Sequence, residues 1–203
     1  MHDIDRILTF WLEPRPDTAE QLEARWTYWF FGNDPAVDLE IRDRFGALTE
    51  AARSGALDDW ATTPRGALSL IILIDQFSRN IHRGTPAAFS ADDNALAIAE
   101  AAYAAGLFGD LDVNENMFAS MPFRHAEHLE AQKRCVAIAV TDALRGKAEW
   151  RGKLTANVDW ARKHLDVVAR FGRFPHRNAA LGRASTPEEV EYLAYLRHAG
   201  QWL

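Results

Sequence analysis

The chain has 203 residues, a net charge of −6 and a 48% hydrophobic fraction, which together fit a folded domain with a sizeable core. The negative charge argues against general binding to nucleic acid or to anionic membranes, because both need a broad positive surface. The single cysteine, Cys135, excludes an intrachain disulfide and a multi-cysteine zinc site. No apolar run approaches the ~20 residues of a membrane span, and the acidic, interrupted N-terminus is unlike a signal peptide, so we expect a cytoplasmic protein.

Arginine is far more frequent than lysine in this chain, with 19 arginines and 4 lysines. A guanidinium presents a planar fork of donors that pairs with carboxylates and phosphates and tolerates burial. The excess of arginine is consistent with a binding site for a small anionic ligand, although a GC-rich genome would give the same excess of arginine over lysine.

Helical periodicity runs along nearly the whole chain, whereas strand-type alternation is absent over any useful length. Asp-Pro and Thr-Pro start signals precede two helices, Ser90 is expected to open another, and Thr186 with Glu189 forms a capping box before the last. A loop with a short turn is expected over 108–121. The predicted helices cover residues 4–12, 17–31, 35–54, 64–82, 90–106, 124–145, 150–171 and 187–199.

These helices predict an all-α fold of about 8–10 helices, in which short connections place neighbouring helices antiparallel. No glycine- or serine-rich linker divides the sequence, and no fixed repeat is found. We therefore expect a single domain over residues 1–203.

The first polar motif, DQFSRNIHRG, starts at Asp75 and continues the most apolar predicted helix. Asp75, Arg79 and Arg83 follow one another at four-residue intervals on one helix face, in the favourable order for an ion pair. A buried carboxylate needs a partner. Asp75 and Arg79 are therefore either an internal structural pair or part of a pocket wall that also includes Arg83.

The second motif, PFRHAEHL, starts at Pro122. In a continuous helix His125 and Gln132 would lie on one stripe with Leu129, where both polar side chains need hydrogen-bond partners from another element. His125 and His128 have a spacing that could offer two imidazoles to a metal, but no third ligand is fixed, so we predict no metal site. His125 is interpreted as either a hydrogen-bonded core residue or a proton-handling group in a pocket.

The third motif, FGRFPHRN, is a turn between two predicted helices. A glycine ends the first helix and a proline redirects the chain, so Arg173, His176, Arg177 and Asn178 are presented from a fixed backbone. These side chains either contact a ligand or satisfy the ends of helices. His164, beside an apolar stripe of the preceding helix, could add another imidazole.

An aromatic cluster also follows helical spacing near the N-terminus. It consists of Trp26, Trp29, Phe30 and Phe31. Such a cluster fits a core better than it fits a groove for a partner.

The polar motifs resemble those of DUF924, a bacterial family of unknown function. The resemblance rests on DQFSRNIHRGT at 75–85, MPFRHAEHLEAQ at 121–132 and RFGRFPHRNAALGRASTPEE at 170–189, and extends over nearly the whole chain. It implies an all-α fold similar to tetratricopeptide repeats and no established activity. The second motif departs from the family pattern of an acid at 124, serine at 126 and aspartate at 128, because this chain has Arg124, Ala126 and His128.

Three functions fit these observations. Our leading interpretation is a pocket that binds a small anionic ligand, with or without catalysis, where the three motifs converge. A tetratricopeptide-like module could instead bind a peptide or protein in a groove, or the motifs could be purely structural. We expect no cofactor. The candidate ligand-binding residues are Asp75, Arg79, Arg83, His125, Gln132, His164, Arg173, His176, Arg177 and Asn178.

Overall fold

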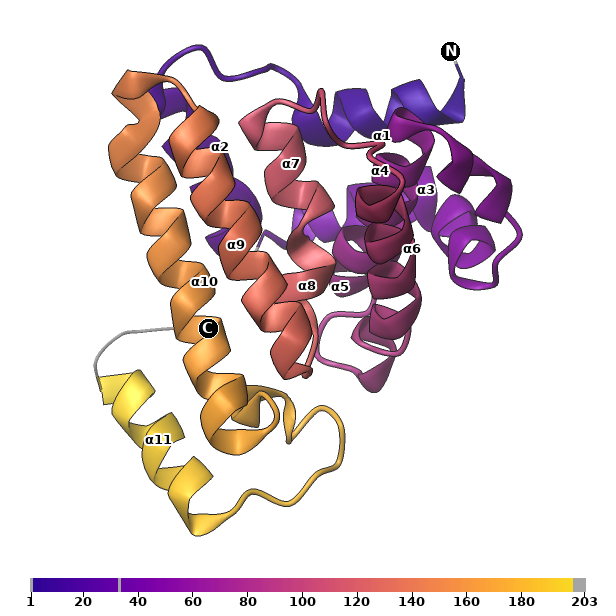
Figure 1. Cartoon of the computed structure of the whole chain (residues 1–203). Helices are drawn as coiled ribbons and strands as arrows, with labels where there is room; N and C mark the ends of the chain where they lie inside the picture. The colour runs from indigo at the N-terminus through magenta and orange to yellow at the C-terminus, as the bar shows by residue number, and fades with distance from the viewer. Residues whose placement is uncertain (1, 33, 199–203) are drawn as a thin grey trace.

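The computed structural model describes residues 2–32 and 34–198, and these ranges are helical without a β-strand (Figure 1). The predicted all-α class is confirmed. The α-helices are α1 (Asp3–Leu12), α2 (Ala19–Phe31), α3 (Pro35–Arg53), α4 (Pro64–Ile71), α5 (Ser78–Ile81), α6 (Asp92–Ala104), α7 (Val113–Ala119), α8 (Met121–His125), α9 (Leu129–Arg145), α10 (Arg151–Phe171) and α11 (Pro187–His198). A π-helical turn, η2 (Ile72–Phe77), joins α4 to α5, and the 3₁₀ turns are η1 (Asp58–Thr62), η3 (Pro86–Ala88), η4 (Ala148–Trp150) and η5 (Pro175–Arg177).

Side-chain caps account for several helix starts. Asp34 caps α3 and Thr63 caps α4, each by accepting a hydrogen bond from a backbone amide of the first turn. Thr186 and Glu189 exchange the two reciprocal bonds of the predicted capping box ahead of α11. The cap predicted at Ser90 is wrong, because α6 begins later and the Ser90 hydroxyl donates to a carbonyl of the preceding turn.

The helix formed by α4, η2 and α5 runs through the centre of the molecule. Every residue from Gly66 to Ser78 is buried, as expected for a segment that is apolar on nearly all sides. Helices α1, α3, α6 and α7 pack around it, and large aromatic side chains such as Trp11, Phe45 and Phe77 fill the space between them. This arrangement carries the first polar motif into the interior.

A second group of helices packs beside this core. Helices α9 and α10, joined by η4, lie side by side as a hairpin (Figure 1). Leu22 of α2 packs against Trp150 and Leu154 at one end of that hairpin. At the other end, Phe174 packs with Val168 and with α11. The candidate pocket described below lies between these helices and the central one.

The region 108–121 differs from its prediction. It contains α7 and the start of α8 instead of a loop, because Asp112 and Glu115 form a capping box that begins a helix. Two short helices here and the division of the central helix by η2 raise the number of α-helices to eleven in the described ranges, above the expected 8–10.

The predicted helix over 124–145 is also wrong, because it is interrupted. α8 ends at His125, Ala126 is extended with φ −69° and ψ 132°, and α9 begins only at Leu129. His125, Leu129 and Gln132 therefore do not share one helical stripe.

No helix within the described ranges is long and apolar enough to cross a membrane. A tetratricopeptide-like arrangement of the helices and a single domain over residues 1–203 stay predictions.

Candidate functional site

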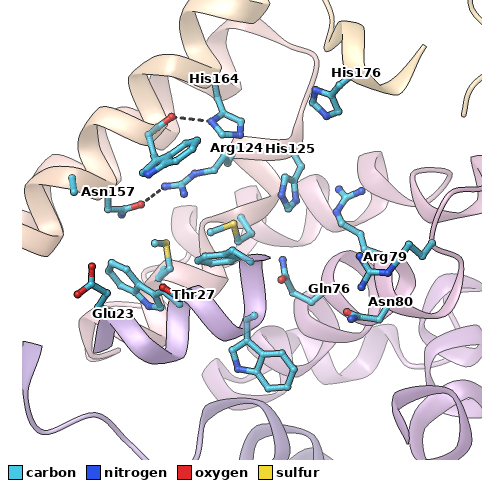
Figure 2. A pocket seen from close by; sticks show the side chains of 18 of the residues that line it. Glu23, Thr27, Gln76, Arg79, Asn80, Arg124, His125, Asn157, His164 and His176 are labelled. Atoms are coloured by element: carbon cyan, nitrogen blue, oxygen red, sulfur yellow. Dashed lines mark hydrogen bonds between the residues drawn. The ribbon is translucent and has the colours of Figure 1, made fainter. Parts of the chain in front are cut away.

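A cavity of about 790 Å³ lies between α2, the central helix, α7, α8, α10 and η5 (Figure 2). Its wall contains side chains from all three polar motifs. The volume is typical of pockets for small organic molecules. The predicted site residues that line it are Arg79, Arg83, His125, His164, His176 and Arg177.

His125 and Asp75 form a hydrogen-bonded pair at the pocket wall. The Nδ1 atom of His125 lies 2.7 and 2.9 Å from the two carboxylate oxygens of Asp75, which is fully buried in the π-helical turn η2. Because an ionised carboxylate only accepts, Nδ1 carries the proton of the neutral ring and Nε2 keeps a lone pair. No hydrogen bond between described residues uses Nε2, and the His125 side chain is 19% exposed, so this nitrogen is left for a ligand or water.

The surroundings of this pair favour an ionised Asp75 and a neutral His125. Burial alone would raise the pKa of Asp75, but His125 and Arg79 together hold it below its usual range. Burial, reinforced by the positive charge of Arg79, lowers the pKa of His125 to about 4, and Asp75 offsets this only in part. The imidazole is therefore neutral at pH 7, which is the state of a general base.

Arg79 and Arg177 share the carboxylate of Asp92. Nη2 of Arg79 lies 2.9 and 3.0 Å from the two Asp92 oxygens and 3.1 Å from Asp75, and Nη1 of Arg177 lies 3.1 Å from Asp92. Both guanidinium groups also lie over the ring of Phe89, at 5.2 and 4.8 Å from its centroid. The predicted Asp75–Arg79 pair is confirmed, and it belongs to a larger charged cluster at the pocket wall.

Arg124 is a buried pocket arginine that has no acidic partner among the described residues. It is 6% exposed, and its Nη2 donates to Oδ1 of Asn157 at 2.6 Å (Figure 2). Its Nε atom is buried without a hydrogen-bond partner. The other cations of the wall each pair with a carboxylate: Arg79 and Arg177 with Asp92, Arg83 with Asp38, and Lys153 with Glu23. Within residues 2–32 and 34–198, the guanidinium of Arg124 therefore carries a positive charge next to the cavity and hydrogen-bonds only to a neutral amide.

His164 faces the same cavity from α10. Its Nδ1 donates to the carbonyl of Trp160 at 2.8 Å, as drawn in Figure 2, so the neutral ring keeps a lone pair on Nε2. Burial, and then the positive charge of Arg124, lower the pKa of His164 to about 3. Burial also lowers the pKa of His176 to about 4, so the pocket holds three imidazoles that are neutral at pH 7: His125, His164 and His176.

Aromatic side chains supply much of the remaining wall. Trp26, Trp29 and Phe30 of α2 are partly buried and pack against the core as predicted, yet they also line the cavity. Trp160 of α10 adds another aromatic side chain. These rings offer flat apolar surfaces within the same space as Arg124.

Four predicted site residues do not line the pocket, and each has a structural partner instead. Asp75 lies behind His125, and Gln132 donates to backbone carbonyls at the end of α8. Arg173 forms an ion pair with Glu189 at 2.7 Å, and the Asn178 amide donates to the same carboxylate. Among these four, Asp75 contacts the ring of the pocket residue His125, and the Gln132 side chain contacts the backbone carbonyl of the pocket residue Arg124.

The sequence pattern misses several residues of this site, among them Arg124, Asn157 and Asp92. Arg124 directly precedes His125 in the second motif. In the continuous helix that the sequence predicted, its side chain would have pointed away from the stripe that contains His125 and Gln132. Asn157 and Asp92 lie outside the three motifs, and their roles depend on contacts between distant helices. No group of histidine, cysteine and acidic side chains that could hold a metal occurs among the described residues, and His128 is exposed.

Comparison with known proteins gives a family and one related structure. The model of the family described as bacterial protein of unknown function (DUF924) matches residues 7–196. The chain belongs to the DUF924 family. A solved structure of a protein of unknown function from Agrobacterium tumefaciens is 35% identical, with a TM-score of 0.76 over 94% of this chain and 96% of that one. The comparison with curated proteins gives no match.

Proposed function

We propose that this DUF924 protein binds a small organic anion in the pocket and that Arg124 holds the anionic group. A buried guanidinium without an acidic partner carries a large desolvation penalty, which a bound negative charge would offset. The Arg124 side chain lines a cavity that is large enough for a ligand, and its Nε has no hydrogen-bond partner among the described residues. The environment of Arg124 is the observation that carries this proposal.

The rest of the wall indicates the class of anion. One guanidinium without an acidic partner matches one negative charge, and its planar fork suits a carboxylate. Trp26, Phe30 and Trp160 offer flat apolar surfaces for the remainder of the ligand. We therefore infer an aromatic or otherwise planar monocarboxylate.

Isothermal titration calorimetry with benzoate and its uncharged counterpart benzamide tests the proposal. We expect benzoate to bind the wild type more tightly than benzamide does, and the Arg124→Met variant to lose about 10-fold or more of the benzoate affinity. Arg65→Met is the matched control, because Arg65 lies outside the pocket in an exposed pair with Asp5. It should bind benzoate like the wild type.

Two results would contradict the proposal. One is the absence of saturable benzoate binding to the wild type. The other is equal benzoate affinity in the wild type and Arg124→Met, since the carboxylate would then be held elsewhere.

A tetratricopeptide-like module that binds a peptide is the alternative. It would use the aromatic side chains of α2 as a groove, but it gives no reason for the buried charges beside them. An array of tetratricopeptide type, a single domain over residues 1–203, a cytoplasmic location and the lack of a cofactor remain expectations from the sequence.

A further inference from the structure

Anion binding by Arg124 gives no role to the hydrogen-bonded pair of His125 and Asp75. His125 is the next residue in the chain, and its Nε2 has no hydrogen bond to a described residue although the ring lines the cavity. Its Nδ1 proton is fixed by two short contacts to the carboxylate of Asp75. A purely structural hydrogen bond would not require the ring to line a cavity.

We propose that His125, oriented by Asp75, is a general base that activates water to hydrolyse a separate ester group on the ligand whose free carboxylate is bound at Arg124. This inference rests on the proposed function, because Arg124 would hold the carboxylate while His125 acts on the ester group. Asp75 is a positioning residue, since it fixes the ring orientation and keeps the proton on Nδ1.

The step can be written with every atom accounted for. Nε2 of His125 takes a proton from water as the water oxygen forms a bond to the acyl carbon of the ester. The tetrahedral intermediate then breaks its bond between the acyl carbon and the alcohol or phenol oxygen. The imidazolium of His125 returns its proton to that leaving oxygen, which regenerates the neutral ring and leaves a carboxylic acid and an alcohol or phenol.

The surroundings of His125 supply a neutral base and a nearby cation, which are the two groups that ester hydrolysis needs. Because burial and Arg79 lower the pKa of His125 to about 4, the ring is neutral at pH 7 and its Nε2 can accept a proton. The same ring can assist water while it adds to an ester carbonyl, because the proton moves as the new bond forms. Arg177, which is close enough to lower the pKa of His125, can stabilise the negative oxygen of the intermediate.

Hydrolysis of 4-acetoxybenzoate tests the inference, because this ester combines a benzoate carboxylate with an activated acetyl group. Its product 4-hydroxybenzoate is followed by absorbance. We expect the wild type to accelerate its release in a saturable manner and His125→Gln to lose about 100-fold or more of that rate. His125→Gln should still bind benzoate, which shows that the variant is folded and keeps the Arg124 site.

His82→Gln is the matched control. His82 is paired with Glu50 at 3.1 Å in another histidine–carboxylate contact that lies outside the pocket, so its loss should leave the rate unchanged. A wild type that binds benzoate but is no faster than His125→Gln would overturn the catalytic role and leave the anion site intact. A wild type that does not bind benzoate would overturn the proposed function itself, and the ester inference with it.

Discussion

Arg124 and Arg79 are arginines of one pocket with opposite electrostatic surroundings. Arg79 contacts the carboxylates of Asp75 and Asp92, whereas Arg124 contacts the neutral amide of Asn157. An arginine held by two acids stabilises the free protein. A buried arginine without an acidic partner destabilises the free protein until a ligand supplies a negative charge. Arg79 and Arg124 should therefore respond differently to the same substitution.

Replacement by methionine tests this difference. Arg79→Met should lower the free energy of unfolding by about 3–5 kcal/mol, because it removes the arginine that pairs with the buried carboxylate of Asp75 and one of the two arginines that pair with Asp92. Arg124→Met should lower it by less than about 1 kcal/mol, or raise it, because a desolvated charge is removed. Urea denaturation without ligand measures both values. Equal losses would show that the charge of Arg124 is already compensated in the free protein.

The histidines of the pocket couple stability to pH. The pKa of His125 is lowered to about 4 and that of His164 to about 3, from 6.5 in an unfolded chain. Between pH 6.5 and about 4 the unfolded state therefore binds more protons than the folded state. Stability is present above the unfolded pKa and is lost as the pH falls through this range. The charged and titratable groups facing His125 are Asp75, Arg79, Arg124, His164, His176 and Arg177.

The His125→Gln variant tests this coupling. Its free energy of unfolding should fall less steeply than that of the wild type between pH 6.5 and 4, by about 1–3 kcal/mol over the range. Denaturation curves of both proteins should be compared at each pH, because Asp142, whose burial raises its pKa to about 6, adds a trend of the opposite sign. Parallel curves for the two proteins would contradict a neutral, buried His125.

The element that matters most for the site is the break between α8 and α9. Gln132 of α9 donates through Nε2 to the carbonyls of Phe123, Arg124 and Ala126, at 3.2, 2.6 and 2.7 Å. One amide thus satisfies the free carbonyls where α8 ends. The break lets α8 present Arg124 and His125 to the cavity while α9 continues in another direction.

Gln132→Met should disturb both the fold and the site. The carbonyls at the end of α8 would lose their donor inside the core, which lowers the free energy of unfolding by about 2–3 kcal/mol. Benzoate affinity should fall as well, since α8 carries Arg124. Urea denaturation and calorimetry measure the two effects. A variant with wild-type stability and affinity would show that the end of α8 is held by other contacts.

The sequence predicts most helices because proline, glycine and capping residues mark their ends. Asp34, Thr63 and Gly172 are examples, the last with a positive φ of 68° at the end of α10. It does not predict the break near Ala126, which has neither glycine nor proline and depends on Gln132 from the following helix. Capping and turn residues therefore do not predict a helix end whose backbone conformation depends on a side-chain hydrogen bond from the next helix.

At the scale of the whole molecule, the pocket depends on a contact between distant segments. Glu127, in the break before α9, accepts a hydrogen bond from the Phe174 amide at 2.7 Å and pairs with Arg183 at 2.9 Å. These bonds hold the turn that carries His176 and Arg177 beside the break between α8 and α9, and Figure 2 shows His176 of this turn near His125 of α8. The positions of polar residues along the predicted helices suggest that the three motifs meet. The aromatic wall from α2 and the partners of Arg124 cannot be predicted in this way, because they depend on how distant helices pack together.

The central claim is that Arg124 binds the carboxylate of a small planar anion. A crystal structure of the protein soaked with 4-bromobenzoate tests it most directly, because anomalous scattering locates the bromine. We predict one bromine peak in the pocket near Trp26, Phe30 or Trp160, with the carboxylate on the Arg124 guanidinium. A pocket without bromobenzoate, or a carboxylate bound away from Arg124, would contradict the account.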